Sequence, residues 1–346
     1  MSKKLRFAAI GCGRMGLRRM RNIVDHPDTD LMCVADSDDD RAGQVAKDFG
    51  VEHAAINEVI SRTDLDCVVI STPNKFHPET VVPALENGKH VWCEKPLARN
   101  PEEGLQMVKA AISSGSFLKT GSNLRYFPSV QKAKELLDTT AIGEILFVRG
   151  WIGNAGWQLK SWYSDSDTIG AGTFLDNGSH LLDIYRWFLG EPLECIGYSA
   201  TVHWPISPLE DNAMGVFKFA NGKLASLHSS WTEWAEYMYV EIYGKDGYLR
   251  IDNRLPSCLT IHGRKDGPAE VFDFSKEPPQ SYALEFDDFV KAISGKRQPQ
   301  PSGLDGLRAV QMAYGVYESS RSGKSISLWE EGDKRVFEAH KKAYGG

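Results

Sequence analysis

The stretch LRFAAIGCGRMG, residues 5–16, sets the architecture of the first third of the chain. Its first six residues form a short continuous apolar run, which is typical of a strand buried on both faces of a parallel sheet. Three glycines follow with the spacing G-x-G-x-x-G, and a helix is expected to begin near the third of them. The first glycine permits a tight turn, the second lets the backbone approach a pyrophosphate, and the third lets the helix pack on the strand. This order predicts a dinucleotide-binding loop made of Gly11, Cys12, Gly13, Arg14, Met15 and Gly16.

An acidic residue at the end of the second strand strengthens this prediction. Asp36 follows the apolar run LMCVA, at the distance where a carboxylate accepts hydrogen bonds from an adenosine ribose, and Ser37 lies beside it. The acidic run DSDDD would repel a 2′-phosphate, which favours NAD over NADP as the cofactor. Two alternatives remain: Asp38 or Asp39 caps the next helix, and Arg41 leaves NADP binding open.

The alternation of apolar strands and amphipathic helices continues to about residue 122. Further strands are expected at residues 66–72, 90–94 and 117–121, with glycines at the ends of the helices between them. This pattern predicts a doubly wound parallel sheet, a Rossmann domain over residues 1–122, with ligands at the carboxyl ends of its strands.

Two loops of that predicted domain are expected at the carboxyl edge of the sheet. The first contributes the candidate cofactor ligands Ser71, Thr72, Pro73, Asn74 and His77. The second, CEKP, contributes Glu94 and Lys95, and the proline that follows Lys95 keeps that lysine out of the helical region. The alternative is ordinary turn chemistry in both loops, and for His77 a role in capping the next helix.

Residues 123–346 predict a second domain, α+β in character, around an open and mostly antiparallel sheet. The run EILFVRGWIG at 144–153 indicates a strand, and Asn221-Gly222 and Lys245-Asp246-Gly247 are hairpin signals. Two helical patterns follow, at 281–295 and 303–323. A sheet of this kind has one covered face and one exposed face, so we expect a homo-oligomer that buries the exposed one.

A candidate proton-transfer pair lies in this second part. In GAGTFLDNGSH, residues 170–180, Asp176 and His180 are four residues apart at the expected start of a helix. Residues four apart share one face of a helix, so both side chains can act on one ligand. The competing interpretation is structural: Asp176 caps the helix and His180 packs in the core.

Composition narrows the function. The chain has 346 residues, a net charge of −6 and a pI near 5.9, which give no electrostatic reason to bind nucleic acid or an anionic membrane. Its six cysteines are scattered, without a CxxC pair or a zinc-like Cys/His cluster, so we expect reduced thiols, no metal and a cytoplasmic location. No apolar run approaches the roughly 20 residues that span a bilayer. The expected partner is a small polar molecule.

Several segments together resemble one enzyme family. GCGRMG, STPNKFH, CEKP, GSNLRYFP, the GAG and DNGSH motifs and the run from 303 to 328 are similar to the glucose-fructose oxidoreductase/inositol dehydrogenase/MocA (Gfo/Idh/MocA) family. The resemblance implies an NAD(P)-dependent oxidoreductase acting on a sugar or cyclitol, with a Rossmann domain and a second domain whose open sheet forms a homodimer or homotetramer. Ala171 replaces the middle glycine of the family's usual triple-glycine run. This departure bears on the conformation of the loop and not on the chemistry.

The resemblance also assigns roles to residues. In similar enzymes the lysine of E-K-P and the Asp and His of D-x-x-x-H surround the reacting hydroxyl, which corresponds here to Lys95, Asp176 and His180. The hypothesis is that His180 is the general acid/base, Asp176 orients it or the substrate, and Lys95 stabilises the alkoxide. The Lys95-Pro96 peptide is expected to be cis. Further candidate substrate contacts are Asn123, Arg125 and Trp157, with Asp183 a weaker one.

Two rival functions remain open at this point. One is a reductase of nucleotide-linked ketosugars in the same family, which would need a basic entrance for a diphosphate. The other is a non-catalytic NAD(P)-binding sensor or co-regulator, because the same fold can hold a dinucleotide without turning anything over. The presence of Lys95, Asp176 and His180 favours an enzyme.

Overall fold

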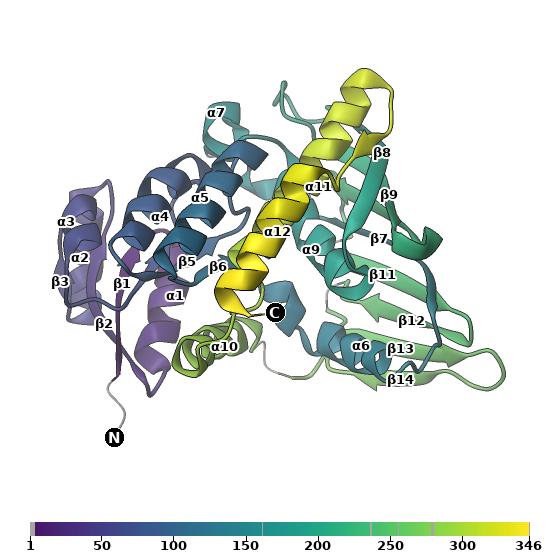
Figure 1. Cartoon of the computed structure of the whole chain (residues 1–346), viewed down its shortest axis with the longest axis horizontal. Helices are drawn as coiled ribbons and strands as arrows, with labels where there is room; N and C mark the ends of the chain where they lie inside the picture. Colours follow the sequence, from purple (N-terminus) through teal and green to yellow (C-terminus); the bar gives the residue numbers. More distant parts are fainter. Residues whose placement is uncertain (1–3, 161, 236, 255, 278–279, 346) are drawn as a thin grey trace. The chain divides into compact units, whose positions relative to one another are not determined.

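The chain forms two units, each assembled from segments that lie apart in the sequence (Figure 1). The computed structural model describes residues 4–160, 162–235, 237–254, 256–277 and 280–345. The first unit is built on the chain up to Ser122, together with residues 282–307 and the segment from Arg335 onward. The second unit comprises residues 123–281 and 308–334.

This division differs from the single boundary at 122/123 that the sequence predicted. Helix α10 (Ser281–Gly295) belongs almost entirely to the first unit, because its Phe286 and Phe289 pack in that unit's core against Phe7. At the C-terminus, the Tyr344 hydroxyl hydrogen-bonds to backbone carbonyls of the same unit. An amphipathic pattern predicts that a helix packs, but it does not say on which domain.

The first unit contains the doubly wound sheet. Its six strands lie in the order β3-β2-β1-β4-β5-β6, and every neighbouring pair is parallel, which confirms the predicted fold class. The elements are β1 (Leu5–Ile10), α1 (Arg14–Asp25), β2 (Thr29–Ala35), α2 (Asp39–Phe49), β3 (Glu52–His53), α3 (Ile56–Ser61), β4 (Cys67–Ile70), η1 (Asn74–Phe76), α4 (His77–Glu86), β5 (His90–Glu94), α5 (Pro101–Ser114) and β6 (Leu118–Gly121).

The topology of this sheet positions the predicted cofactor loops. The strand order reverses direction between β1 and β4, and ligands of such sheets bind beside that switch point, beyond the carboxyl ends of the strands. The glycine loop follows β1, Asp36 follows β2, Ser71 follows β4 and Lys95 follows β5. These residues therefore share one edge of one sheet.

The second unit is built on a nine-stranded mixed sheet. The strands lie in the order β14-β13-β12-β11-β7-β10-β9-β8-β15, and the pairs are antiparallel except β7 with β10. Its elements are η2 (Asn123–Tyr126), α6 (Pro128–Asp138), β7 (Ile145–Gly153), η3 (Trp157–Lys160), η4 (Trp162–Ser164), α7 (Ser166–Ile169), α8 (Thr173–Asp176), α9 (Gly178–Leu189), β8 (Pro192–Ala200), β9 (Asn212–Phe219), η5 (Ala220–Gly222), β10 (Leu224–Ser230), β11 (Tyr237–Gly244), β12 (Gly247–Asp252), β13 (Leu259–Arg264), β14 (Glu270–Asp273) and β15 (Ile326–Ser327).

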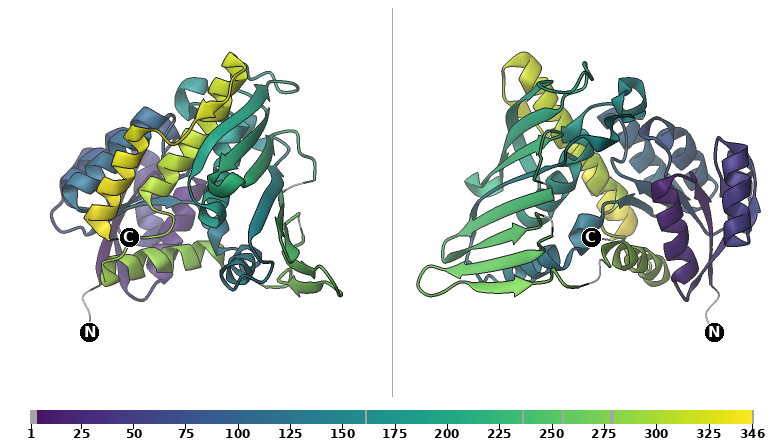
Figure 2. Two further views of the ribbon diagram at one scale, coloured as in Figure 1. Left: turned by 45° about the vertical axis from the view of Figure 1, so that its right-hand side comes forward. Right: turned by 180° about the vertical axis from the view of Figure 1, so that it is seen from behind.

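One face of this sheet is covered by helices and the other is open (Figure 2). Helices α6 and α9 contact the strands, and Val316 of α11 (Gly303–Ser322) lies against Gly197 and Gly215 of β8 and β9. On the opposite face Tyr198 is 72% exposed and Met214 is 57% exposed. The predicted open sheet is confirmed, and both predicted hairpin turns join paired strands.

The chain ends in a helix that the sequence analysis did not predict, α12 (Glu331–Tyr344). The described residues of α12 are all partly or fully exposed, so the helix lacks the stripe of buried apolar residues by which an amphipathic helix is predicted. In the described part of the chain, no helix combines the length and the apolar character that a membrane crossing requires.

Candidate active site

A side chain would find open space at Gly13 of the glycine loop, but at Gly11 and Gly16 it would clash with backbone. Gly11 has a φ of +98°, and an added Cβ there would lie 2.6 Å from the Ser71 carbonyl oxygen. At Gly16 an added Cβ would lie 1.8 Å from the Gly11 carbonyl oxygen, so helix α1 packs directly on the loop. At Gly13, which begins α1 without a side-chain cap, an added Cβ would meet nothing within 4 Å. The backbone is therefore open to an anion where the second glycine of the motif requires it.

Asp36 is fixed against this loop. Its carboxylate accepts hydrogen bonds from the backbone N–H of Cys12 at 2.6 Å and of Asp38 at 3.0 Å, and from the Arg41 guanidinium at 2.7 Å. Burial alone would raise the pKa of Asp36, but these hydrogen bonds outweigh it and hold the pKa below its ordinary value. Asp36 thus stays ionised, as a ribose acceptor must. Asp38, not Asp36, caps helix α2, which confirms that alternative for Asp38.

Two buried hydroxyls follow strand β4. Ser71 Oγ and Thr72 Oγ1 are buried and have no hydrogen-bond partner within the protein. A buried hydroxyl left without a partner is costly, so a polar ligand at this edge would satisfy both groups. Together with the open space at Gly13 and the ionised Asp36, these residues fit a dinucleotide. Pro73 and Asn74 lead from them into η1, where Asn74 is buried.

His77 is buried between two loops of the first unit. Its ring has no exposed surface, and its two nitrogens lie 3.0 Å from the carbonyl oxygens of Leu97 and Thr72. Burial lowers the pKa of His77, although both carbonyls oppose that shift. His77 therefore joins the loops that follow β4 and β5. The side chain of His77 does not cap α4, so that alternative is wrong, and contact with the nicotinamide ribose stays a prediction.

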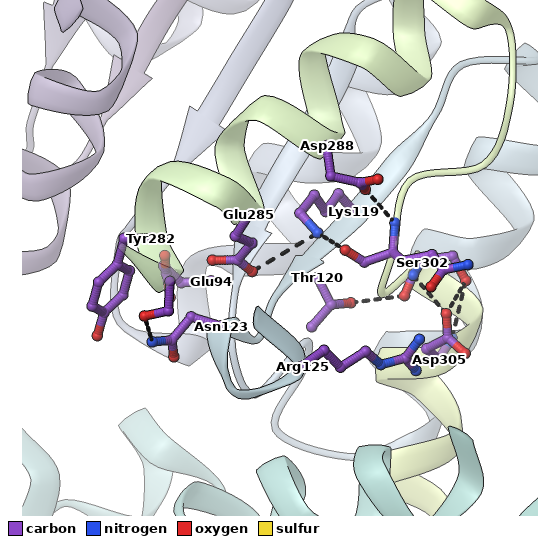
Figure 3. Close-up of polar contacts among 12 residues, drawn as sticks. Glu94, Lys119, Thr120, Asn123, Arg125, Tyr282, Glu285, Asp288, Ser302 and Asp305 are labelled. Atoms are coloured by element: carbon purple, nitrogen blue, oxygen red, sulfur yellow. Dashed lines mark hydrogen bonds and ion pairs between the residues drawn. The ribbon is translucent and has the colours of Figure 1, made fainter. Parts of the chain in front are cut away.

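Glu94 belongs to a buried charge network in the first unit, of which Figure 3 shows the contact between Lys119 and Glu285. Its carboxylate accepts a hydrogen bond from Arg19 Nε at 2.5 Å, and Arg19 Nη1 donates to Glu285 Oε2 at 2.9 Å. Lys119 Nζ lies 3.8 Å from the second Glu285 oxygen. The Arg19 guanidinium also lies 4.2 Å from the centre of the Trp92 ring. Glu94 therefore has a structural role, since its carboxylate is bound to α1, and its contact with the cofactor stays a prediction.

The residue after Glu94 is Lys95, and the Lys95-Pro96 peptide is cis, as the family resemblance implied. Because Glu94 is tied to α1, the backbone from which Lys95 extends is fixed relative to the glycine loop within the same unit. Lys95 itself takes part in further interactions.

In the second unit, Asp176 and His180 lie on one nearly continuous helix. Asn177, between α8 and α9, has helical angles of φ −78° and ψ −42°. Asp176 is 7% exposed and His180 is 6% exposed. The backbone N–H groups of residues 172–175 are bound by Glu210 and Tyr317. The helical run starts after Gly172, well before Asp176, so the alternative that Asp176 caps the start of the helix is wrong.

The other predicted substrate contacts differ in their surroundings. Arg125 donates to the Asp183 carboxylate through Nε at 2.8 Å, and both side chains are buried. The Asn123 amide donates to Ser281 Oγ at 3.0 Å, as Figure 3 shows. Trp157, in η3, is 55% exposed. Asp183 lies three residues after His180, so the Arg125 guanidinium is held beside the helix face that carries the candidate pair.

Four further residues that shape these sites were not predicted from the sequence: Arg19, Glu285, Glu210 and Tyr317. Arg19 lies in an amphipathic helix where an arginine is normally solvated, and Tyr317 is indistinguishable from a core aromatic in an apolar helix. Glu210 lies beside Asp211 in a loop, where a glutamate is normally solvated, so it carried no signal either.

Comparisons with known proteins agree with this geometry. A family model described as "Oxidoreductase family, NAD-binding Rossmann fold" matches residues 5–122, and one described as "GFO/IDH/MocA C-terminal domain" matches residues 130–250. The chain belongs to the Gfo/Idh/MocA family. As a Gfo/Idh/MocA oxidoreductase it uses NAD, which the residues at the switch point of its sheet fit.

Named relatives of this Gfo/Idh/MocA protein span several activities. It is 26% identical over 337 residues to scyllo-inositol 2-dehydrogenase (NAD(+)) of Bacillus subtilis, covering 95% of this chain and 97% of that protein. It is 31% identical over 258 residues to 2,7-anhydro-N-acetylneuraminate hydratase of Escherichia coli, covering 72% and 68%. A solved levoglucosan dehydrogenase in complex with NADH and levoglucosan shares the fold, with a TM-score of 0.87 at 24% identity over 95% of this chain and all of that one.

Proposed function

We propose that this protein is an NAD-dependent dehydrogenase that interconverts a secondary hydroxyl and a ketone on a sugar or cyclitol. The observation that carries the proposal is a buried row of ionisable residues on one helix. Asp176, His180 and Asp183 follow at intervals of four and three, which place them on one face, and all three are buried. Neighbouring buried ionisable groups on one helix face are candidates for a functional site.

The proposed chemistry assigns one task to each residue. Bound NAD supplies the hydride acceptor. His180 removes the hydroxyl proton of the substrate as general base and returns it in the reverse direction, which suits an imidazole near neutral pH. Asp176 orients the imidazole or the substrate hydroxyl. Lys95 holds the substrate oxygen and stabilises the negative charge that develops on it.

Relatives support the substrate class. The inositol and levoglucosan dehydrogenases named above act on polyhydroxylated rings, and such rings offer the secondary hydroxyl that the proposed chemistry requires. Trp157 is exposed in the same unit as His180, and an exposed aromatic ring suits contact with a sugar face.

A spectrophotometric screen tests this proposal. Purified protein with NAD or NADP is assayed against inositols, free aldoses, anhydro sugars and nucleotide sugars, with NADH or NADPH followed in both directions. We expect turnover of an inositol or free sugar with NAD. Tight NADH binding without turnover across the panel would favour the sensor, and turnover restricted to nucleotide sugars would favour the ketosugar reductase.

A second candidate follows from the relative of 31% identity, which is named as a hydratase. Addition of water to an anhydro sugar leaves no net change in NADH absorbance. Mass spectrometry of the same reactions detects it as a product heavier by one water. Such a product without any net NADH formation would replace dehydrogenation as the proposed reaction.

We also infer a homodimer or homotetramer that buries the open face of the second sheet, in a cytoplasmic setting. Ile196 pairs with Val216 and Tyr198 with Met214 across β8 and β9, and all four are exposed. A contiguous apolar face of this kind is unusual on a monomer. Met214→Lys should shift the mass measured by light scattering toward the monomer, whereas a wild-type protein that is itself monomeric would contradict the inference.

A further inference from the structure

We propose that Glu210 and Tyr317 are positioning residues for the candidate catalytic helix, because together they bind four consecutive backbone N–H groups immediately before Asp176. The inference rests on the proposed function of Asp176 and His180. Neither Glu210 nor Tyr317 is near this helix in the sequence: Glu210 lies in the loop between β8 and β9, and Tyr317 lies on α11.

Glu210 binds the first three of these groups. Its Oε2 accepts the N–H of Gly172 at 2.8 Å, and its Oε1 accepts that of Phe174 at 2.9 Å. Its backbone carbonyl accepts the N–H of Thr173 at 3.1 Å. The first N–H groups of a helix have no partners within the helix, so a carboxylate that binds them fixes the position and the rotation of its first turn.

Tyr317 completes the arrangement. Its hydroxyl donates to Glu210 Oε1 at 2.7 Å and accepts the N–H of Leu175 at 2.9 Å. One hydroxyl thereby both holds the Glu210 carboxylate and binds the residue before Asp176. Glu210 and Tyr317 are both buried, so water does not compete for these hydrogen bonds.

Contact between Glu210 and the helix start is as close as a backbone allows. A Cβ added at Gly172 would lie 1.9 Å from the Glu210 carbonyl oxygen and 2.7 Å from its Oε2. Glycine at 172 is therefore required by the approach of Glu210. The family motif places small residues at this point, and the structure gives a physical reason for the one at 172.

The loop that carries Glu210 is itself held in place. The carboxylate of the next residue, Asp211, accepts the backbone N–H groups of Val202, His203 and Trp204 at 2.8–2.9 Å. Hydrogen bonds within the loop therefore hold the backbone that carries Glu210. A rigid support of this kind keeps reacting groups in a productive geometry, where a displacement of about 1 Å can cost roughly 100-fold in rate.

A matched control lies in the same unit. Tyr185 is also fully buried, and its hydroxyl donates to the Ser226 carbonyl oxygen at 2.9 Å. It is on α9, the helix that carries His180, but its hydroxyl bonds to β10 and not to residues 172–175. Tyr185→Phe and Tyr317→Phe each remove one buried hydroxyl without changing the shape of the ring. Only Tyr317→Phe removes a contact with the helix start.

The experiment compares these two variants with the wild-type protein. We expect similar small drops in melting temperature for both and unchanged NADH affinity by fluorescence titration. With the panel sugar that the wild-type turns over fastest, Tyr317→Phe should lower kcat by roughly 10- to 100-fold, whereas Tyr185→Phe should keep it within about twofold. Hydrogen exchange should accelerate at the amides of residues 172–176 in Tyr317→Phe alone.

The outcomes separate this inference from the proposed function. If His180→Asn abolishes turnover but Tyr317→Phe keeps kcat and the slow exchange at 172–176, the positioning role is overturned and the proposed function stands. If His180→Asn keeps full turnover, the proposed catalytic role of His180 fails, and this inference with it; a wild-type protein that oxidises no panel sugar would contradict the proposed function itself. Should Tyr317→Phe fold poorly, Glu210→Gln replaces it, because it preserves the shape of the side chain but removes the charge that the N–H groups bind.

Discussion

Two alanine substitutions in the glycine loop should affect different properties: Gly13→Ala should weaken NADH binding, and Gly16→Ala should destabilise the fold. Gly13 has φ −77° and ψ −173°, angles that any residue adopts, and its missing Cβ faces open space. Gly13→Ala should therefore leave the melting temperature unchanged or slightly higher. The new methyl group would occupy the place where a pyrophosphate approaches the backbone. Losing one charge-assisted hydrogen bond, about 1.5–3 kcal/mol, weakens NADH binding by roughly 10- to 100-fold.

Gly16→Ala should instead damage the fold. Its Cβ would lie 1.8 Å from the Gly11 carbonyl oxygen, where contacts closer than 3.0 Å essentially never occur. The atom that must move belongs to backbone, so the cost is near the upper end for overpacking, about 3 kcal/mol. This corresponds to a loss of roughly 6–12 °C in melting temperature for a domain of this size.

Differential scanning fluorimetry and NADH fluorescence titration measure both variants under identical conditions. If Gly13→Ala bound NADH within twofold of the wild-type, the pyrophosphate would not approach the loop at that glycine. A Gly16→Ala protein that melted like the wild-type would show that α1 does not pack on the loop as closely as the structure indicates.

Three further substitutions test other parts of the structure. Arg19→Met removes the cation from buried Glu94 and leaves Glu285 with Lys119 alone, and it should cost about 3–5 kcal/mol in urea unfolding, against under about 1 kcal/mol for the exposed neighbour Arg18→Met. Backbone hydrogen bonds lower the pKa of Asp211 despite its burial, so the ionised Asp211 stabilises the fold fully above the ordinary Asp pKa, and this stabilisation is lost as pH falls through the lowered pKa. Asp211→Asn should therefore be less stable than the wild-type at pH 7. A difference in unfolding free energy between the two proteins that failed to narrow on acidification would contradict this. Asp36→Asn should raise the affinity for NADPH relative to NADH in parallel titrations, whereas an unchanged ratio would remove Asp36 from cofactor selection.

Local sequence signals predicted the Rossmann unit well. Its strands, the glycine loop and Asp36 follow from apolar runs, glycine spacing and an acid at a fixed distance, all of which are determined by nearby residues. The Asn221-Gly222 and Lys245-Asp246-Gly247 turns were predicted for the same reason. The fold class of both units could therefore be predicted before any tertiary contact was known.

What the sequence could not provide were contacts between distant segments. Phe286 joins the core around Phe7, and Glu285 binds Arg19, because the chain returns to the first unit after residue 281. The N–H groups at 172–174 are bound by Glu210, so a local pattern suggested Asp176 as a cap where a distant residue serves instead. His77 had a site-like motif, but only its burial shows that it is a structural link.

Single-turnover formation of NADH shows whether His180 transfers the hydroxyl proton of the substrate. Wild-type protein and His180→Asn are mixed with NAD and the panel sugar that the wild-type oxidises, and NADH affinity is measured separately. We expect a rate of NADH formation lower by roughly two to four orders of magnitude in His180→Asn, with NADH affinity unchanged. A rate within threefold of the wild-type, or an equal loss of NADH affinity and rate, would contradict it.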